Sequence, residues 1–387
     1  MQWMVPERRL DEYQLEVLRN CGVLKGQNQW IQGFAGSGKS VLLMHAVQRI
    51  VASHSESKIC IVVYTHALRQ LLSSGLSERH KHIPVMTYHE FLYGQTPHVE
   101  PFDILVIDEV QDIPEQELRR LQARATRVIV AGDMDQSIYQ HVGRQADPLA
   151  ILTPNVYKLT TIHRLTKRLI DIVRTILPGS PIEGARTGRM QEVQVTLAKA
   201  DSFDQEAAWV WEQCRRYSKQ GEPSAVLFPL HFGVQKFINA VARLEGSPIF
   251  DFSRTGDKRG ADYNEVNARL TKEGVALRFV GNGFGDLEES DIRPLTYVMT
   301  YHSSKGLDFN TVFLPGLNRD MTIWRDNEDI ARRLFFVATT RSRRNLFMSH
   351  SSDTPHRYVQ AMPQNLLHNE SCKPRKAPLA FDDDIPF

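Results

Sequence analysis

An octapeptide near the N-terminus, GFAGSGKS, has the composition of a phosphate-binding loop. It fits the pattern GxxxxGK[ST], follows a strand-like apolar segment and precedes a helix-like one, which is the context that the pattern requires. Glycines allow backbone N–H groups to point at phosphate oxygens, and the start of a helix favours negative charge. Lys39 would reach the outer phosphates, and Ser40 would bind Mg²⁺. The sequence therefore predicts a nucleoside triphosphate site formed by Gly33, Phe34, Ala35, Gly36, Ser37, Gly38, Lys39 and Ser40.

Two adjacent acids, Asp108 and Glu109, follow the apolar run Ile104–Ile107. An acidic pair at the end of a strand is most often only a solvated strand end. Downstream of a phosphate-binding loop, however, the same pair favours a second acidic motif. Asp108 would then hold Mg²⁺, and Glu109 would polarise the attacking water.

The apolar pattern predicts the elements that position these residues. Short apolar runs alternate with segments of helical period, which is typical of parallel sheets covered by helices. The first set of expected strands is QWIQGF, ICIVVYT, IPVMTY, DILVIDE and RVIVAGD; the second is VQVTLA, SAVLFP, VALRFV, YVMTYH, TVFLPG and NLFMSH. We predict an α/β chain of two tandem units, residues 1–157 and 158–362, followed by a flexible linker and an acidic tip over residues 363–387.

Composition excludes several classes of protein. The chain has 387 residues, of which 42% are hydrophobic and 24% charged, so wholesale disorder is excluded. The longest apolar runs are far shorter than the roughly 18 residues of a membrane span. The start of the chain lacks the layout of a signal peptide, so a cytoplasmic location and no membrane partner are expected. The four cysteines are isolated, which argues against a disulfide framework and a zinc ribbon.

Seven further segments occur in order along the chain: LDEYQ, YTHALRQLL, TYHEF, AGDMDQSIY, TIHRLT, TYHSSKGLDF and RLFFVATTRSR. Together with the phosphate-binding loop and the acidic pair, they resemble the motifs of the UvrD/Rep-like superfamily 1 DNA helicases. The resemblance extends to about residue 350. It implies two tandem RecA-like P-loop NTPase domains, ATP and Mg²⁺ as cofactors, and single-stranded DNA as a partner.

The resemblance places nucleotide contacts in both units. In the first unit, Gln14 would read the adenine and Gln136 would sense the terminal phosphate. In the second, Arg164 would lie against the γ-phosphate and Arg341 would be the arginine finger. Since an arginine fork can grip phosphate oxygens and stabilise charge in transfer, the site would close only when the two units approach.

Three more residues are assigned to the nucleotide by the resemblance. His163 stands where a tyrosine usually stacks on adenine, and its smaller ring predicts weaker stacking. Gly306 and Asp308 belong to TYHSSKGLDF. Asp308 replaces the usual glutamate, which shortens its reach toward a ribose or backbone partner.

The resemblance also implies a track for single-stranded DNA. Aromatic faces would stack on bases, while hydroxyl groups and cations would contact phosphates. Each of these side chains could equally be a packed core residue, and His141 stands where the family commonly has a base-stacking tryptophan. The candidates are Thr65, Tyr88, His89, Tyr139, His141, His302 and Ser304.

Two insertions of the large family members are missing. Only about 15 residues separate Leu72 from Thr87, and Gly281 from Tyr297, so neither inserted helical subdomain fits. We therefore predict a minimal two-domain motor, for which translocation is expected rather than processive unwinding.

The last seven residues, FDDDIPF, resemble the C-terminal tip of bacterial single-stranded DNA-binding proteins. A phenylalanine ring and a terminal carboxylate could enter a basic-rimmed pocket of a partner protein, with the acids adding steering. The alternatives are a solubilising tail and a tail that competes with DNA phosphates. The predicted docking residues are Asp382, Asp383, Asp384, Ile385, Pro386 and Phe387.

Two hypotheses of different classes follow. The first is an ATP-dependent single-stranded DNA translocase or helicase that moves 3′ to 5′, in DNA repair, replication, or mobile-element and phage-defence processes. The second is an adaptor that uses its ATP-bound shape as a switch and docks replication or repair proteins through its tip, without productive unwinding. A helicase-like subunit of a nuclease complex is a third possibility, although the chain shows no nuclease motif.

Overall fold

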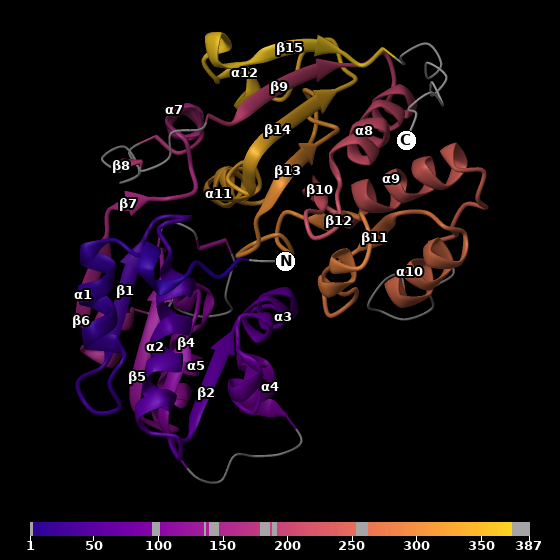
Figure 1. Ribbon diagram of the computed structural model, residues 1–387. Coiled ribbons are helices and arrows are strands. Elements are labelled where there is room, and N and C mark those ends of the chain that lie inside the picture. Colours follow the sequence, from indigo (N-terminus) through magenta and orange to yellow (C-terminus); the bar gives the residue numbers. More distant parts are fainter. Residues whose placement is uncertain are drawn as a thin grey trace, which may run out of the picture.

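Two parallel sheets form the framework of the protein (Figure 1). The computed structural model describes residues 3–94, 101–134, 137–138, 147–178, 186–187, 192–252 and 262–373. In both sheets every pair of neighbouring strands is parallel. The predicted fold class, an α/β chain with two tandem parallel-sheet units of RecA-like type, is confirmed.

The first sheet has six strands, and its central strands are apolar on both faces because helices cover both sides. All side chains of the run ICIVV are buried, for example. The strand order is β3 (Val85–Thr87), β2 (Ile59–Val63), β4 (Phe102–Ile107), β5 (Ala125–Gly132), β1 (Gln29–Gly33) and β6 (Asn155–Leu159). The helices of this unit are α1 (Glu12–Cys21), α2 (Lys39–Ser53), α3 (His66–Ser74), α4 (Tyr88–Tyr93), α5 (Glu115–Gln122) and α6 (Pro148–Leu152).

The second sheet has seven strands and follows the predicted set closely. Its order is β11 (Leu277–Phe279), β12 (Thr296–Thr300), β10 (Ser224–Phe228), β13 (Phe309–Leu314), β14 (Ser342–His350), β9 (Gln194–Lys199) and β15 (His368–Ser371). The helices are α7 (Lys167–Ile176), α8 (Phe203–Tyr217), α9 (His231–Leu244), α10 (Tyr263–Lys272), α11 (Glu328–Thr339) and α12 (Arg357–Gln360). In Figure 1 this unit lies above the first, and a short pair, β7 (Thr161–Ile162) and β8 (Arg186–Thr187), lies beside the connection.

Both expected domain limits need correction. Strand β6 pairs with β1 up to Leu159, so the first sheet continues past residue 157. Residues 363–373 do not form a linker, because β15 pairs in parallel with β9 and adds an edge strand to the second sheet. The polar composition of HNES hid this strand, and all four of its side chains are exposed as on an edge. In the described ranges, no helix is both long and apolar enough to cross a bilayer.

A buried arginine links one end of the first sheet to the end of α1. Arg127 in β5 is only 2% exposed and donates to backbone carbonyls of Asn20, Val23 and Gln27 at the end of α1 and in the loop beyond it. Burial lowers the pKa of this guanidinium. The side chain thus satisfies carbonyl groups that helix geometry leaves without partners.

We expect Arg127→Met to cost about 1–3 kcal/mol, because it leaves buried carbonyls without donors. The measurement is urea unfolding followed by circular dichroism, with Arg124→Met as the control at an exposed arginine nearby. Equal unfolding midpoints for the two variants would contradict this role of Arg127.

Candidate nucleotide site and DNA track

The phosphate-binding loop lies between β1 and α2, as its sequence predicts. Gly36 and Gly38 have φ angles of +77° and +92°, which residues with a side chain rarely adopt. A Cβ atom at Gly36 would also lie 2.4 Å from the Cβ atom of Arg164. The loop therefore requires glycine both for its turn and for the approach of a residue from beyond the first sheet.

Polar groups of the loop form a cradle that fits phosphate. Lys39 is 8% exposed, and its Nζ atom donates to the carbonyl oxygens of Gly33 and Phe34 at 2.7 and 3.1 Å. In the described part of the chain, the buried Ser37 hydroxyl has no hydrogen-bond partner. A buried ammonium, a free hydroxyl and the start of α2 make this loop a suitable site for a triphosphate.

The acidic pair faces the loop from the end of β4. Ser40 donates to Asp108 Oδ2 at 2.6 Å, so the two predicted magnesium ligands lie together. Burial and the charge of Glu109 raise the pKa of Asp108 to about 6. A hydroxyl and a carboxylate are the oxygen ligands that Mg²⁺ accepts while phosphates supply others. These two side chains would therefore hold the ion.

Glu109 sits in a backbone conformation that aims it away from its strand. Its φ angle is +54°, and its Oε2 atom accepts a hydrogen bond of 2.5 Å from Gln111. Burial works to raise the pKa of Glu109, but the positive charges of Lys305 and Lys39 hold it below its usual value. Glu109 is therefore kept ionised, as a group that orients water requires.

A cavity of about 610 Å³ adjoins the loop at the side where a base would lie. Gln14, which is buried, donates to the Ser37 carbonyl at 3.0 Å and lies 3.2 Å from the Nε2 atom of His163. The backbone N–H of His163 donates to the Gly36 carbonyl at 2.9 Å. The structure thus brings both predicted adenine-contacting residues to one wall of this cavity.

Both predicted arginines reach the same interface from the second unit's side. Arg164 lies against the loop and pairs with Asp308, with 3.3 Å between Nη1 and Oδ2. Arg341 is 2% exposed and donates to the carbonyl oxygens of Val337 and Leu307 at 2.8 and 2.9 Å. Burial and the nearby charge of Arg164 lower the pKa of Arg341 to about 9.

A buried ion pair joins the two units beside Glu109. Lys305, from the turn after β12, lies 2.6 Å from Asp112, three residues after Glu109, and both side chains are 1% exposed. Burial raises the pKa of Asp112 to about 7, against the effect of the lysine charge. A charge pair that is this deeply buried ties the position of the turn to that of the segment that carries Glu109.

A second cavity, of about 190 Å³, opens between the units at the predicted DNA track. Its lining combines residues after β2 with residues after β11 and β12: Tyr64, Thr65, His66, Ala67, Gly281, Asn282, His302 and Ser303. Tyr88 stacks on Tyr64 with 5.3 Å between ring centroids. Burial, with the charge of Lys305, lowers the pKa of His302 to about 4, so this ring is neutral at physiological pH.

Several predicted contacts have a different outcome. Ser304 is fully buried and donates to the Tyr301 carbonyl at 2.8 Å, so it does not fit a role in DNA contact; Ser303 lines the cavity instead. Gly306 (φ +78°) allows the turn to approach α3, since a Cβ atom there would lie 2.4 Å from Leu68. His89 is exposed, and Thr65 both lines the second cavity and caps α3 by accepting a hydrogen bond from Leu68 N. Gln136, Tyr139, His141 and the tip 381–387 lie outside the described residues.

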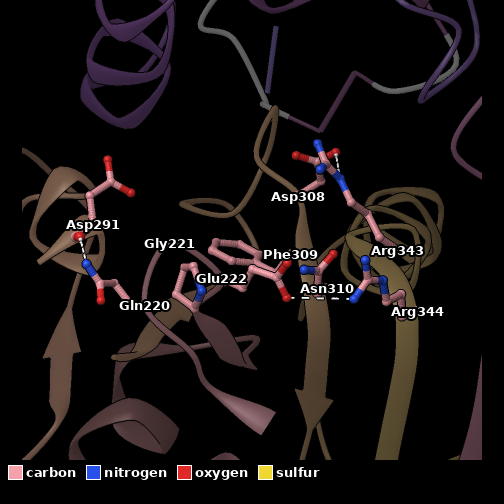
Figure 2. Close-up of a pocket in the computed structure, with 10 residues that line it drawn as sticks. Gln220, Gly221, Glu222, Asp291, Asp308, Phe309, Asn310, Arg343 and Arg344 are labelled. Carbon is pink, nitrogen blue, oxygen red and sulfur yellow. Dashed lines mark hydrogen bonds and ion pairs between the residues drawn. The ribbon is translucent and has the colours of Figure 1, made fainter. Parts of the chain in front are cut away.

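Sequence reasoning missed four residues of this region: Lys305, Asp112, Tyr64 and Arg343. Lys305 lies in the largely polar segment TYHSSKGLDF, and Asp112 follows Asp108, Glu109 and Gln111, so neither charge stands out in its local sequence. Arg343 donates to Asp308 Oδ2 at 2.7 Å at one end of a third cavity, of about 640 Å³, on the second unit (Figure 2). Nothing in its local sequence distinguishes Arg343 from the exposed Arg344.

Comparisons with known proteins find matches in two separate parts of the chain. Residues 9–194 match the family model described as an AAA domain, and residues 283–353 match the UvrD-like helicase C-terminal domain. The ATP-dependent DNA helicase PcrA of Staphylococcus aureus (strain MRSA252) is 31% identical over 109 residues, which are 24% of this chain and 15% of that protein.

A second relative gives a similar picture. The ATP-dependent DNA helicase Rep of Buchnera aphidicola subsp. Schizaphis graminum is 35% identical over 88 residues, 19% of this chain and 13% of that protein. The chain thus matches only a small part of each relative. Among solved structures, the PRRSV helicase gives a TM-score of 0.44 at 15% identity, covering 90% of this chain and 56% of that one.

Proposed function

We propose that this protein is an ATP-dependent motor of the UvrD/Rep-like class that translocates along single-stranded DNA in the 3′ to 5′ direction. One observation carries the proposal: the phosphate loop and acids of one unit meet the half-buried Arg164 and the buried Arg341 of the other at a single interface. The same interface continues into an aromatic-lined cavity. The matches to an AAA domain and to a UvrD-like helicase C-terminal domain support this assignment.

The proposed cycle couples the nucleotide to the distance between the units. ATP would bind with its base beside Gln14 and its phosphates on Lys39, and Mg²⁺ held by Ser40 and Asp108 would neutralise phosphate charge. Arg164 and Arg341 would grip the γ-phosphate and so favour the closed interface. Glu109 would orient the water, and loss of the γ-phosphate would release the arginines and let the units separate.

Two short connections support translocation rather than extensive unwinding. Between Leu72 and Thr87 the chain contains only the end of α3, a 3-10 turn (Glu78–His80) and β3. Between Gly281 and Tyr297 it contains a turn, a 3-10 segment (Glu288–Asp291) and the start of β12. Neither connection has room for an inserted subdomain, so we infer a minimal motor that separates long duplexes poorly by itself.

Tyr88→Ala should weaken single-stranded DNA binding by about 1–3 kcal/mol, because the Tyr64–Tyr88 pair offers a stacking face to a base. Fluorescence anisotropy with labelled oligo(dT) measures this loss, and affinity should also fall steeply with salt. Tyr93→Ala, at the exposed end of the same short helix, is the control. Equal affinities for the Tyr88 variant and the unchanged protein would show that Tyr88 serves only in packing.

Steady-state ATP hydrolysis with and without single-stranded DNA tests the proposed function. A translocase should show strong stimulation by DNA. Flat turnover would favour the second candidate, an ATP-driven switch that docks other proteins through Asp382–Phe387. The second candidate is supported only by the resemblance of the C-terminal tip.

A further inference from the structure

We propose that Asp308 is a positioning residue, which orients the Arg164 guanidinium toward the phosphate loop, and not a ligand of the nucleotide sugar. The inference rests on the proposed function, because it concerns the same site. It departs from what the resemblance implies for this position, where the usual glutamate reaches a ribose or backbone partner.

Within the described ranges, the polar contacts of the Asp308 side chain are with arginines. Its Oδ2 atom accepts a hydrogen bond of 2.7 Å from Arg343 Nε and lies 3.3 Å from Arg164 Nη1. Asp308 directly precedes β13, and Arg343 belongs to the adjacent strand β14. In Figure 2 the Asp308 and Arg343 side chains meet at one end of the cavity, apart from the pair formed by Glu222 and Arg344. Two neighbouring strands thus hold this carboxylate in place.

Arg164 is held at both of its ends. Its Cβ atom lies against Gly36, and the preceding residue, His163, donates to the Gly36 carbonyl. Its guanidinium pairs with Asp308, and the Arg164 side chain is only 14% exposed. The main chain of Arg164 therefore lies against the loop of the first unit, while its guanidinium is oriented by a carboxylate of the second unit.

Charge explains why a carboxylate is needed here. Three guanidinium groups, those of Arg164, Arg341 and Arg343, act on Asp308; although burial opposes them, they lower its pKa. Burial, followed by the charge of Arg164, lowers the pKa of Arg341, as expected for like charges that lie close together. Asp308 is thus a counter-charge for these cations, together with Glu109, whose charge also acts on Arg164 and Arg341.

The position of Asp308 does not suit a sugar contact. The cavity beside Gln14 and His163 is lined by residues of the first unit and the segment after β6, and Asp308 is not among the described residues that line it. Asp308 lines the separate cavity on the second unit. An aspartate is also one methylene shorter than the usual glutamate. The Asp308 side chain therefore extends only as far as the arginines that it contacts.

The two roles predict opposite shifts for Asp308→Asn, measured without DNA. As a positioning residue, the variant should lose kcat by about tenfold or more, while the Kd for a non-hydrolysed ATP analogue stays equal or becomes lower, because a negative charge near the phosphates has gone. As a sugar ligand, it should weaken analogue binding and leave kcat nearly unchanged. The second pattern would overturn the proposal.

Two further variants keep the test sharp. Asp308→Glu retains the charge and should keep kcat within about threefold of the unchanged protein. The double variant Asp308→Asn with Arg343→Gln removes one charge of each sign and should recover part of the lost kcat; no recovery would contradict the charge argument. Thermal unfolding reports folding of each variant. Failure of the proposed function would appear separately, as unchanged protein whose ATPase does not respond to DNA.

Discussion

Lys39→Ala and Glu109→Gln should each reduce ATP turnover by about 10²–10³-fold or more. Lys39 is the buried ammonium of the phosphate cradle, and Glu109 is the carboxylate that the neighbouring lysines keep ionised. The first change removes charge neutralisation, whereas the second removes the group that orients the water. Phosphate release under saturating ATP and single-stranded DNA measures both losses.

Binding separates the two variants. Glutamine has almost the shape of glutamate and can still meet Gln111, so Glu109→Gln should bind a fluorescent ATP analogue with nearly unchanged affinity. Lys39→Ala should bind it more weakly. Lys25→Ala, at an exposed lysine before β1, is the control for lysine removal. Turnover like that of the unchanged protein in both variants would refute the assignment of the site.

Arg341→Ala should lower kcat by about 10³–10⁵-fold, the range attributed to arginine fingers, with a much smaller change in nucleotide affinity. Arg341 is buried opposite the loop, and its charge acts on Glu109. Arg341→Lys should restore little, because an ammonium cannot replace the planar fork. Single-turnover hydrolysis measures the chemical step directly.

Folding must be controlled in the Arg341 variants, since this side chain also donates to the Val337 and Leu307 carbonyls. Thermal unfolding and analogue binding serve that purpose. If Arg341→Ala changes only KM, Arg341 serves only to bind nucleotide. The proposal that both units contribute to one catalytic site would then be wrong.

Local pattern was sufficient to predict most of the framework, although β6 was not among the expected strands. Parallel strands such as β2 and β4 are continuous apolar runs, and the glycine loop needs a strand before it and a helix after it. Strand β15 was not predicted because HNES is polar, and only its pairing with β9 makes it a strand. Its stability comes from a long-range partner that local sequence does not reveal.

The candidate site was predictable only in part for the same reason. Motif positions located Ser40 and Asp108, which the structure brings to 2.6 Å. Pairs between distant segments, such as Lys305 with Asp112, depend on how the units meet. Ser303 lines the cavity between the units, whereas the adjacent Ser304 donates to the Tyr301 carbonyl. The conformation of the single turn after β12 decides which of these two hydroxyl groups reaches the cavity.

Displacement of streptavidin from biotinylated oligonucleotides tests the claim of directional translocation most directly. With ATP, the protein should remove streptavidin from a 5′-biotin end and leave a 3′-biotin end intact, as the proposed 3′ to 5′ movement requires. Glu109→Gln should remove neither. Faster displacement from the 3′ end would reverse the direction, and no displacement from either end, despite DNA-stimulated ATP hydrolysis, would contradict translocation itself.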